Sequence, residues 1–154
     1  MTTSEAPIAK VLVVCLGNIC RSPMGEAVLS AAAKKRGLNI TVDSCGTAGY
    51  HVGEDPDDHK IPISHHSRKL SAADFTEFTH ILASDANNLR DIKRVMPDIS
   101  TADIRLWGSY LDGKSIPDPW YGGLSGFEDT YQQCTALSDA FLDQLEESTQ
   151  KSGL

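Results

Sequence analysis

A cysteine and an arginine six positions later form the pattern in this chain with the clearest chemical use, namely Cys15 and Arg21. A thiolate is a strong nucleophile, and a guanidinium can bind two oxygens of a phosphate at once. Between them, Gly17 permits a sharp turn and Asn18 tolerates a left-handed backbone, so that successive N–H groups can face a tetrahedral oxyanion. The spacing therefore predicts a phosphate-binding loop with a thiol nucleophile at its base.

The residues after this loop favour the charged form of the thiol. Ser22-Pro23 is a typical start of a helix, whose N-terminus carries partial positive charge. That charge, the loop N–H groups and Arg21 would each stabilise the thiolate of Cys15, and the Ser22 hydroxyl can donate a hydrogen bond to the sulfur. An isolated cysteine at a strand end is more often a core residue, and C-x5-R is short. Its position between an apolar strand and a helix start makes the catalytic interpretation the stronger one.

A second candidate group is Asp118, which lies between Pro117 and Pro119. The two prolines hold the carboxyl group in an extended segment, from which it can protonate a leaving oxygen as a general acid. Trp120 and Tyr121 follow, and they could line a slot for an aromatic leaving group. Taken alone, these residues are more typical of a turn and of core aromatics. Their catalytic interpretation depends on the segment around Cys15.

Short β-branched runs alternate with helical patterns along the chain. Strands are predicted at Ile8–Val14, Asn39–Cys45, Thr79–Ala83 and Ile104–Trp107. Helices are predicted from Ser22-Pro23 to Gly37, over Ser71–Phe78, from an Asp85 cap to about Val95, and from Ser125 onward, the last with Phe127, Tyr131, Cys134, Phe141 and Leu145 on its buried face. This order predicts an α/β fold of three layers, with a parallel sheet covered by helices on both faces. Ligands bind beyond the carboxyl ends of such strands, where the Cys15 loop would lie.

Composition limits the class of protein. A chain of 154 residues with 40% hydrophobic and 23% charged side chains is predicted to form one folded domain, residues 1–154. A net charge of −7 argues against a nucleic-acid surface. Acidic side chains outnumber basic ones from Asp118 onward, which we interpret as a solvated helix face.

The four cysteines match no zinc spacing, so no metal or cofactor is expected. The start has neither a secretion signal nor an apolar span, so a cytoplasmic protein without membrane partners is expected.

The segments Cys15–Pro23 and Asp118–Gly122 resemble the two motifs of the low-molecular-weight protein tyrosine phosphatases, and the likeness extends over nearly the whole chain. The resemblance implies a four-stranded parallel sheet and hydrolysis of protein phosphotyrosine and aryl phosphates through a cysteinyl-phosphate, without a metal. It makes Cys15 the nucleophile, Arg21 the phosphate clamp and Asp118 the general acid. It also implies tyrosine-phosphorylated proteins as partners, and phosphate or vanadate as oxyanions that occupy the loop.

The same resemblance assigns roles to further residues. Substrate contacts are expected from Leu16, Gly17, Asn18, Ile19, Cys20, Ser22, Tyr50, Trp120 and Tyr121. Asn18, Ser22, Ser44 and His66 are expected to support the shape of the loop and the charge of the thiolate. Asp85 also matches a residue of the family, although a role as a helix cap is enough to explain it. Two departures stand out. A helix usual between Glu54 and His65 is largely missing here, and Tyr50 stands where many relatives have tryptophan.

Several alternatives remain open from the sequence. Cys20 could form a protective disulfide with Cys15. Arsenate reduction on the same fold would need further redox cysteines, and none lies between Cys45 and Cys134. Phosphoarginine hydrolysis is another alternative, although phosphatases for that substrate tend to have threonine where this chain has Ile19. A phosphotyrosine-binding module without catalysis would need neither Cys15 nor Asp118.

Overall fold

The sheet at the centre of the molecule is parallel throughout, as predicted. A computed structural model of the chain describes residues 7–15, 21–47, 68–116 and 123–151. Its strands are β1 (Ala9–Cys15), β2 (Ile40–Gly46), β3 (His80–Ala83) and β4 (Asp103–Leu106), in the spatial order β2-β1-β3-β4. Residue Val14 of β1 is in register with Cys45 on one side and with Ala83 on the other. The central strand β1 therefore brings its last residues between two neighbours.

Helices α1, α3 and α4 lie close to their predicted positions, whereas α2 is shorter than predicted. They are α1 (Arg21–Lys35), α2 (Asp74–Glu77), α3 (Ala86–Arg94) and α4 (Gly123–Lys151), with a 3-10 helix η1 at Trp107–Tyr110. Lys34 and Lys35 occupy the last turn of α1, where the helix dipole favours positive charge. Gly37 follows with a φ of 72°, a left-handed conformation that glycine adopts without strain, and so ends the helix.

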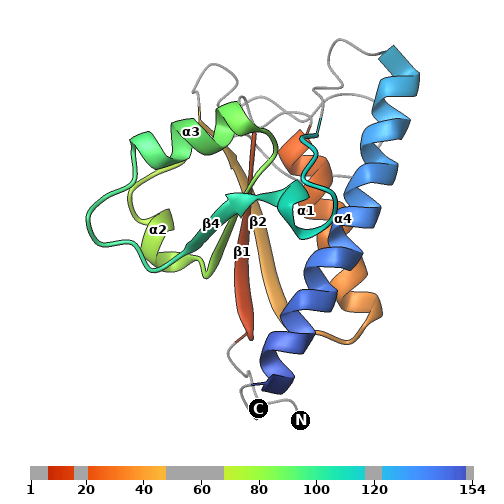
Figure 1. Cartoon of the computed structure of the whole chain (residues 1–154), viewed down its shortest axis with the longest axis horizontal. Helices are drawn as coiled ribbons and strands as arrows, with labels where there is room; N and C mark the ends of the chain where they lie inside the picture. The colour runs from red at the N-terminus through yellow and green to blue at the C-terminus, as the bar shows by residue number, and fades with distance from the viewer. Residues whose placement is uncertain (1–6, 16–20, 48–67, 117–122, 152–154) are drawn as a thin grey trace.

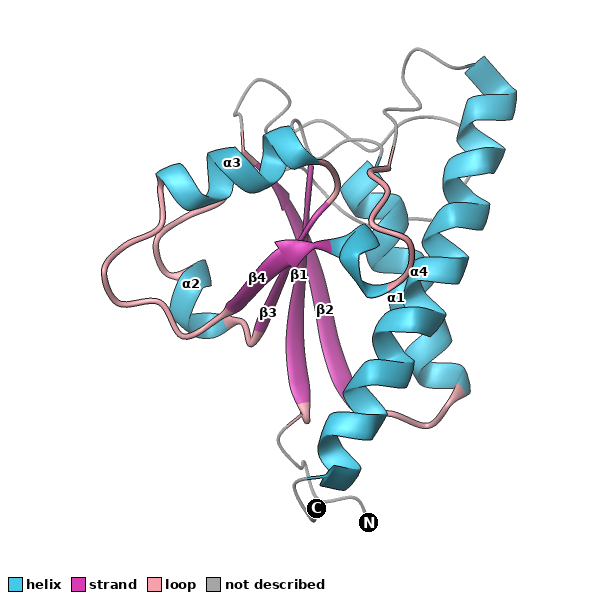
Figure 2. Cartoon of the chain, viewed as in Figure 1, coloured by secondary structure: helices cyan, strands magenta, loops and turns pink. Residues whose placement is uncertain are grey.

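Helices cover both faces of the sheet, α1 and α4 on one and α2 and α3 on the other (Figures 1 and 2). The alternation of side chains along β1 explains why each layer has its own core. Val11 and Val13 belong to the core shared with α1 and α4, whereas Leu12 and Val14 belong to the core shared with α2 and α3. All four are fully buried, as the unbroken apolar run of this strand predicts.

Some sequence predictions are wrong in detail. Trp107 is not the end of the fourth strand but the buried first residue of η1. The helix predicted over Ser71–Phe78 is limited to the single turn of α2. Tyr131 was expected on the buried face of the last helix, yet it is 50% exposed. The buried stripe of α4 instead passes through Thr130, four residues before buried Cys134, because that spacing keeps both side chains on one face.

The acidic face of α4 is more than a solvated surface. Arg36, directly after α1, lies 3.0 Å from Asp143, 2.9 Å from Glu146 and 3.2 Å from Asp139 (guanidinium nitrogen to carboxylate oxygen). The three acids follow one another along one side of α4, so a single guanidinium joins several turns of that helix to the end of α1. The interpretation of this face as purely solvated was therefore incomplete.

His80, the first residue of β3, gives the fold a dependence on pH. Burial lowers the pKa of its imidazole below 6.5, Asp103 opposes this shift, and Arg105 adds to it. The unfolded chain therefore takes up a proton at a higher pH than the folded chain does. Consequently, we expect the free energy of unfolding to decrease as the pH falls below about 6.5, by at most about 1.4 kcal/mol per pH unit for one proton.

Urea unfolding of the wild type and of His80→Phe, at pH values between about 7.5 and about 5.5, tests this expectation. Phenylalanine keeps a ring against Phe141, which His80 contacts edge-on at a centroid distance of 5.2 Å. The variant should show the shallower dependence on pH. Equal slopes in the two proteins would show that His80 does not carry the effect.

Candidate functional site

Cys15 is the last residue of β1 and lies at the carboxyl edge of the sheet. Its side chain is buried and, like those of Cys45 and Cys134, is a reduced thiol. Helix α1 starts at Arg21, so five residues connect the strand to a helix of 15 residues. Ligands of parallel α/β folds bind at this edge, and the N-terminus of a helix attracts anions. The framework on both sides of the loop therefore has the geometry that the sequence predicted.

Hydrogen bonds from two separate segments hold the end of β1, and a third segment bonds to one of these two. The Thr47 N–H donates to the carbonyl of Cys15 at 2.9 Å. The N–H and the hydroxyl of Ser84 both donate to the carbonyl of Val14, at 2.9 Å and 2.7 Å. The N–H of Ile116, a fully buried residue, donates to the carbonyl of Ser84 at 2.8 Å. Ile116 is thus anchored to Ser84, the residue that itself bonds the carbonyl of Val14 next to Cys15.

Ser44, predicted as a supporting residue, is fully buried on β2 and donates its hydroxyl hydrogen to Glu26 at 2.6 Å. Glu26 lies on α1, so this bond connects the helix that follows the loop to the strand beside β1. Burial raises the pKa of Glu26, the hydrogen bond from Ser44 lowers it, and the net shift is upward. The sequence analysis did not identify Glu26, because no motif marks one glutamate within a helix.

An ion cluster lies beside this pair. The guanidinium of Arg68 is 3.1 Å from a carboxylate oxygen of Asp43 and 3.1 Å from one of Asp74. Burial acts to lower the pKa of Arg68, but the hydrogen bond to Asp74 and the neighbouring negative charges outweigh it, so the pKa lies above its ordinary value. Asp43 precedes Ser44 on β2. The cluster therefore fixes the strand next to the candidate site with a permanently charged arginine, and the sequence analysis missed it.

The other thiols that the structure describes are poor nucleophiles. Burial raises the pKa of Cys134 to about 12, and burial also raises that of Cys45 well above its ordinary value. Both therefore stay protonated at neutral pH, and the thiol form is the unreactive one. Cys134 packs in the core between α1 and α4, whereas Cys45 packs in the core on the opposite face of the sheet.

Of the remaining predicted residues, the structure describes some completely, some only in their backbone, and some not at all. Asp85 caps α3 in a capping box, since its carboxylate accepts from the N–H of Asn88 at 2.7 Å and its own N–H donates to the Asn88 side chain. Arg21 and Ser22 lie in the first turn of α1, and only their backbone is described. The following predicted residues lie outside the described part of the chain: Leu16, Gly17, Asn18, Ile19, Cys20, Tyr50, His66, Asp118, Trp120 and Tyr121.

The turn that leads toward Asp118 depends on Gly108. A Cβ atom added there would lie 1.9 Å from the carbonyl oxygen of Lys114, a backbone atom that cannot simply turn aside. The N–H of Gly113 also donates to the carbonyl of Gly108 at 2.8 Å. We expect Gly108→Ala to lower the free energy of unfolding by about 2–3 kcal/mol, measured by urea unfolding. Ser109→Ala, at an exposed position of the same 3-10 helix, is the control; equal stability of the two variants would contradict the expectation.

The described residues show neither a metal-binding cluster nor a membrane-spanning helix. They contain no group of three or more His, Cys, Asp or Glu side chains arranged to hold a metal ion. Within the same residues, no helix combines the length and the apolar character that crossing a membrane requires.

Known proteins resemble the chain over most of its length. Residues 10–151 match the profile of the family described as low molecular weight phosphotyrosine protein phosphatase. The Schizosaccharomyces pombe protein of that name is 46% identical over 147 residues, which cover 86% of this chain and 94% of the relative. A crystal structure of an Entamoeba histolytica protein tyrosine phosphatase, with Hepes in its active site, superposes with a TM-score of 0.85 at 30% identity, over 92% of this chain and 99% of that one.

A crystal structure of a Drosophila arginine phosphatase is also similar, with a TM-score of 0.80 and 36% identity over 88% of this chain and 96% of that chain. The profile match, the identity to the yeast protein and the shared fold all agree with the resemblance that Cys15, Arg21 and Asp118 suggested. The chain belongs to the low molecular weight phosphotyrosine protein phosphatase family, whose members are hydrolases.

Proposed function

We propose that this protein hydrolyses phosphotyrosine on proteins, and aryl phosphates generally, in two displacement steps. In the first, the Cys15 thiolate attacks phosphorus and the bond to the phenolic oxygen breaks, while Arg21 and the loop N–H groups bind the three other oxygens. Protonated Asp118 gives its proton to the leaving phenol. In the second, ionised Asp118 takes a proton from water, which attacks phosphorus and releases phosphate and the thiolate.

The position of Cys15 is the observation that carries this proposal. It is a buried thiol at the carboxyl end of the central strand, six positions before the first residue of α1. The partial positive charge of that helix end stabilises both a thiolate and a phosphoryl group. Cys45 and Cys134 have raised pKa values and packed surroundings, so neither offers the same chemistry.

The assignment of Asp118 is supported by the chain that precedes it. Ile116 is tied by its N–H to Ser84, which itself bonds the carbonyl of Val14. We infer that this connection directs the segment carrying Asp118 toward the edge of the sheet where Cys15 lies.

Substrate class is the part of this proposal that an assay can settle most directly. Initial rates of phosphate release should be compared for phosphotyrosine, phosphoserine and phosphoarginine peptides of one sequence, with vanadate as the competing oxyanion. We expect phosphotyrosine to be the best substrate and vanadate to inhibit its turnover. The similar Drosophila arginine phosphatase makes phosphoarginine the second candidate. Faster phosphate release from the phosphoarginine peptide would make the protein a phosphoarginine phosphatase instead. No release from any of the three peptides would favour a phosphotyrosine-binding module without catalysis.

The same proposal includes the setting in which the protein works. We infer that residues 1–154 form a single phosphatase domain and that tyrosine-phosphorylated proteins are its partners. We also infer a cytoplasmic location, because a thiolate nucleophile is kept reduced there. A protective disulfide between Cys15 and Cys20, which the sequence leaves open, would then form only under oxidation; recovery from peroxide by Cys20→Ser as complete as that of the wild type would contradict it.

A further inference from the structure

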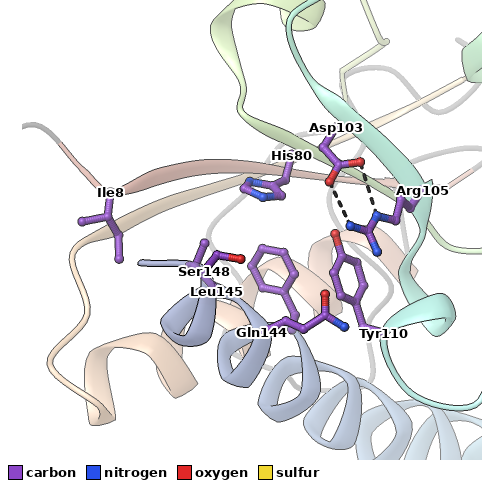
Figure 3. Close-up of a pocket in the computed structure, with 9 residues that line it drawn as sticks. Ile8, His80, Asp103, Arg105, Tyr110, Gln144, Leu145 and Ser148 are labelled. Atoms are coloured by element: carbon purple, nitrogen blue, oxygen red, sulfur yellow. Dashed lines mark hydrogen bonds and ion pairs between the residues drawn. The ribbon is translucent and has the colours of Figure 1, made fainter. Parts of the chain in front are cut away.

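A pocket of about 280 Å³ lies at the end of the sheet opposite to Cys15 (Figure 3). Its walls come from the starts of β3 and β4, from η1 and from the last part of α4, and they include His80, Arg105, Tyr110, Phe141, Gln144 and Leu145. His80 is in register with Val11, four residues before Cys15 on β1. The pocket is therefore separate from the proposed active site, and the proposed reaction uses none of its residues.

The floor of the pocket is aromatic. Phe141 is almost fully buried and lies edge-on to both His80 and Tyr110, with ring centroids 5.2 Å and 5.1 Å apart and interplanar angles of 85° and 86°. Leu145, the next apolar residue of α4 along the same side, extends this surface. Edge-to-face contacts hold these rings in fixed orientations, so a flat apolar ligand meets a preformed surface.

Two polar side chains in the wall can donate to a ligand. The hydroxyl of Tyr110 is buried and finds no hydrogen-bond partner among the described residues. Burial raises the pKa of Tyr110 to about 12, so this hydroxyl keeps its proton and remains a donor. The amide of Gln144 lines the same pocket and lies beside Tyr110 in Figure 3. A buried donor without a partner is unfavourable, and a ligand whose acceptor oxygen displaces the side chains that cover this hydroxyl would relieve that.

His80 provides an acceptor. The Thr79 hydroxyl donates its hydrogen to the carbonyl of Lys10 at 2.9 Å, and it lies 2.8 Å from Nδ1 of His80. With its hydrogen engaged at Lys10, this hydroxyl accepts from Nδ1, so the neutral ring carries its proton there and leaves Nε2 as an acceptor. The charges in the wall cancel, because Arg105 and Asp103 form an ion pair at 3.2 Å. Neither a cation nor an anion is favoured.

We propose that this pocket is a binding site for a small, neutral, planar aromatic amide. The ring would lie against Phe141 and Leu145, the amide oxygen would accept from Tyr110 and Gln144, and the amide N–H would donate to Nε2 of His80. The volume suits one small ring system, since clefts for larger ligands span about 300–1,000 Å³. The proposal does not depend on the reaction at Cys15.

Benzamide is the probe for this site. The ¹⁵N-labelled full chain should be titrated with benzamide in the presence of enough inorganic phosphate to saturate the loop after Cys15. We expect saturable shifts of the backbone amide signals of Tyr110, Gln144 and Leu145. Tyr110→Phe and Gln144→Leu should each weaken binding roughly three- to tenfold. The matched control is Tyr131→Phe, at a half-exposed tyrosine of α4 outside the pocket, and it should bind as the wild type does.

Two further compounds test the chemical class. Benzoate has the same ring with a negative charge, and cyclohexanecarboxamide has the same amide without an aromatic ring; both should bind more weakly than benzamide. The proposal is overturned if the pocket signals do not shift with benzamide, if both pocket variants bind it as well as the wild type, or if either of these compounds binds as tightly.

Discussion

Cys15→Ser is expected to lower kcat/KM for an aryl phosphate by roughly 10⁴- to 10⁶-fold, the range seen when a nucleophile is removed from an enzyme that works through a covalent intermediate. A serine hydroxyl is not ionised near neutral pH, and the environment that stabilises a thiolate does not supply a base to activate it. The replacement changes one atom at a buried position, so the sheet should keep its register on both sides of β1.

The measurement pairs turnover of p-nitrophenyl phosphate with binding of vanadate or phosphate to the inactive protein. Loss of turnover with retained oxyanion binding would separate the chemical role of the sulfur from a role in folding. Cys134→Ala is the matched control, because that thiol is equally buried but lies in the core between α1 and α4. Turnover by Cys15→Ser within about tenfold of the wild type would rule out the covalent mechanism.

Local patterns predicted much of the fold. The apolar run of β1, the glycine after α1 and the acidic cap of α3 are each decided by residues adjacent in the chain, and the structure confirms all three. The strand-helix alternation predicted a parallel sheet covered on both faces, which is also confirmed. In each case the preference arises from backbone hydrogen bonding or helix geometry over a few residues.

Interactions between distant segments were not predictable in the same way. Nothing next to Arg36 in the sequence shows that Asp139, Asp143 and Glu146 face it, because that depends on how α1 packs against α4. The hydrogen bond between Ser44 and Glu26 likewise joins a strand to a helix 18 positions away. A hydrophobic period identifies which side of an element is buried, but it does not identify the partner of a polar group on that side.

The candidate site shows the same difference between features that the sequence predicts and contacts that only the structure reveals. Its chemical identities came from Cys15, Arg21 and Asp118 in the sequence, and these roles remain predictions. What the structure adds is a set of hydrogen bonds near the strand end: Thr47 and Ser84 bond carbonyls of β1, and Ile116 bonds Ser84, although the three residues belong to segments far apart in the chain. Their hydrogen bonds to the backbone carry no sequence motif, since most residue types have an N–H to donate.

Asp118→Asn is expected to lower kcat/KM by about 10²- to 10⁴-fold, the usual contribution of a general acid. The loss should depend on the leaving group, because a phenol of low pKa leaves readily without a proton and one of high pKa does not. We therefore expect a larger loss with phenyl phosphate than with p-nitrophenyl phosphate. Asp112→Asn is the matched control: Asp112 accepts from the Lys114 N–H at 3.0 Å in the segment leading to Ile116, and asparagine can accept the same bond.

The pH profile gives an independent measure of the same group. The wild type needs a thiolate and a protonated carboxyl group together, so its kcat/KM should rise and then fall with increasing pH, with the optimum on the acid side of neutrality. Asparagine does not ionise, so Asp118→Asn should lose the fall at higher pH while it keeps the rise that reports the thiol. If the variant keeps the alkaline fall, or loses equal rate with both leaving groups, another residue must supply the proton.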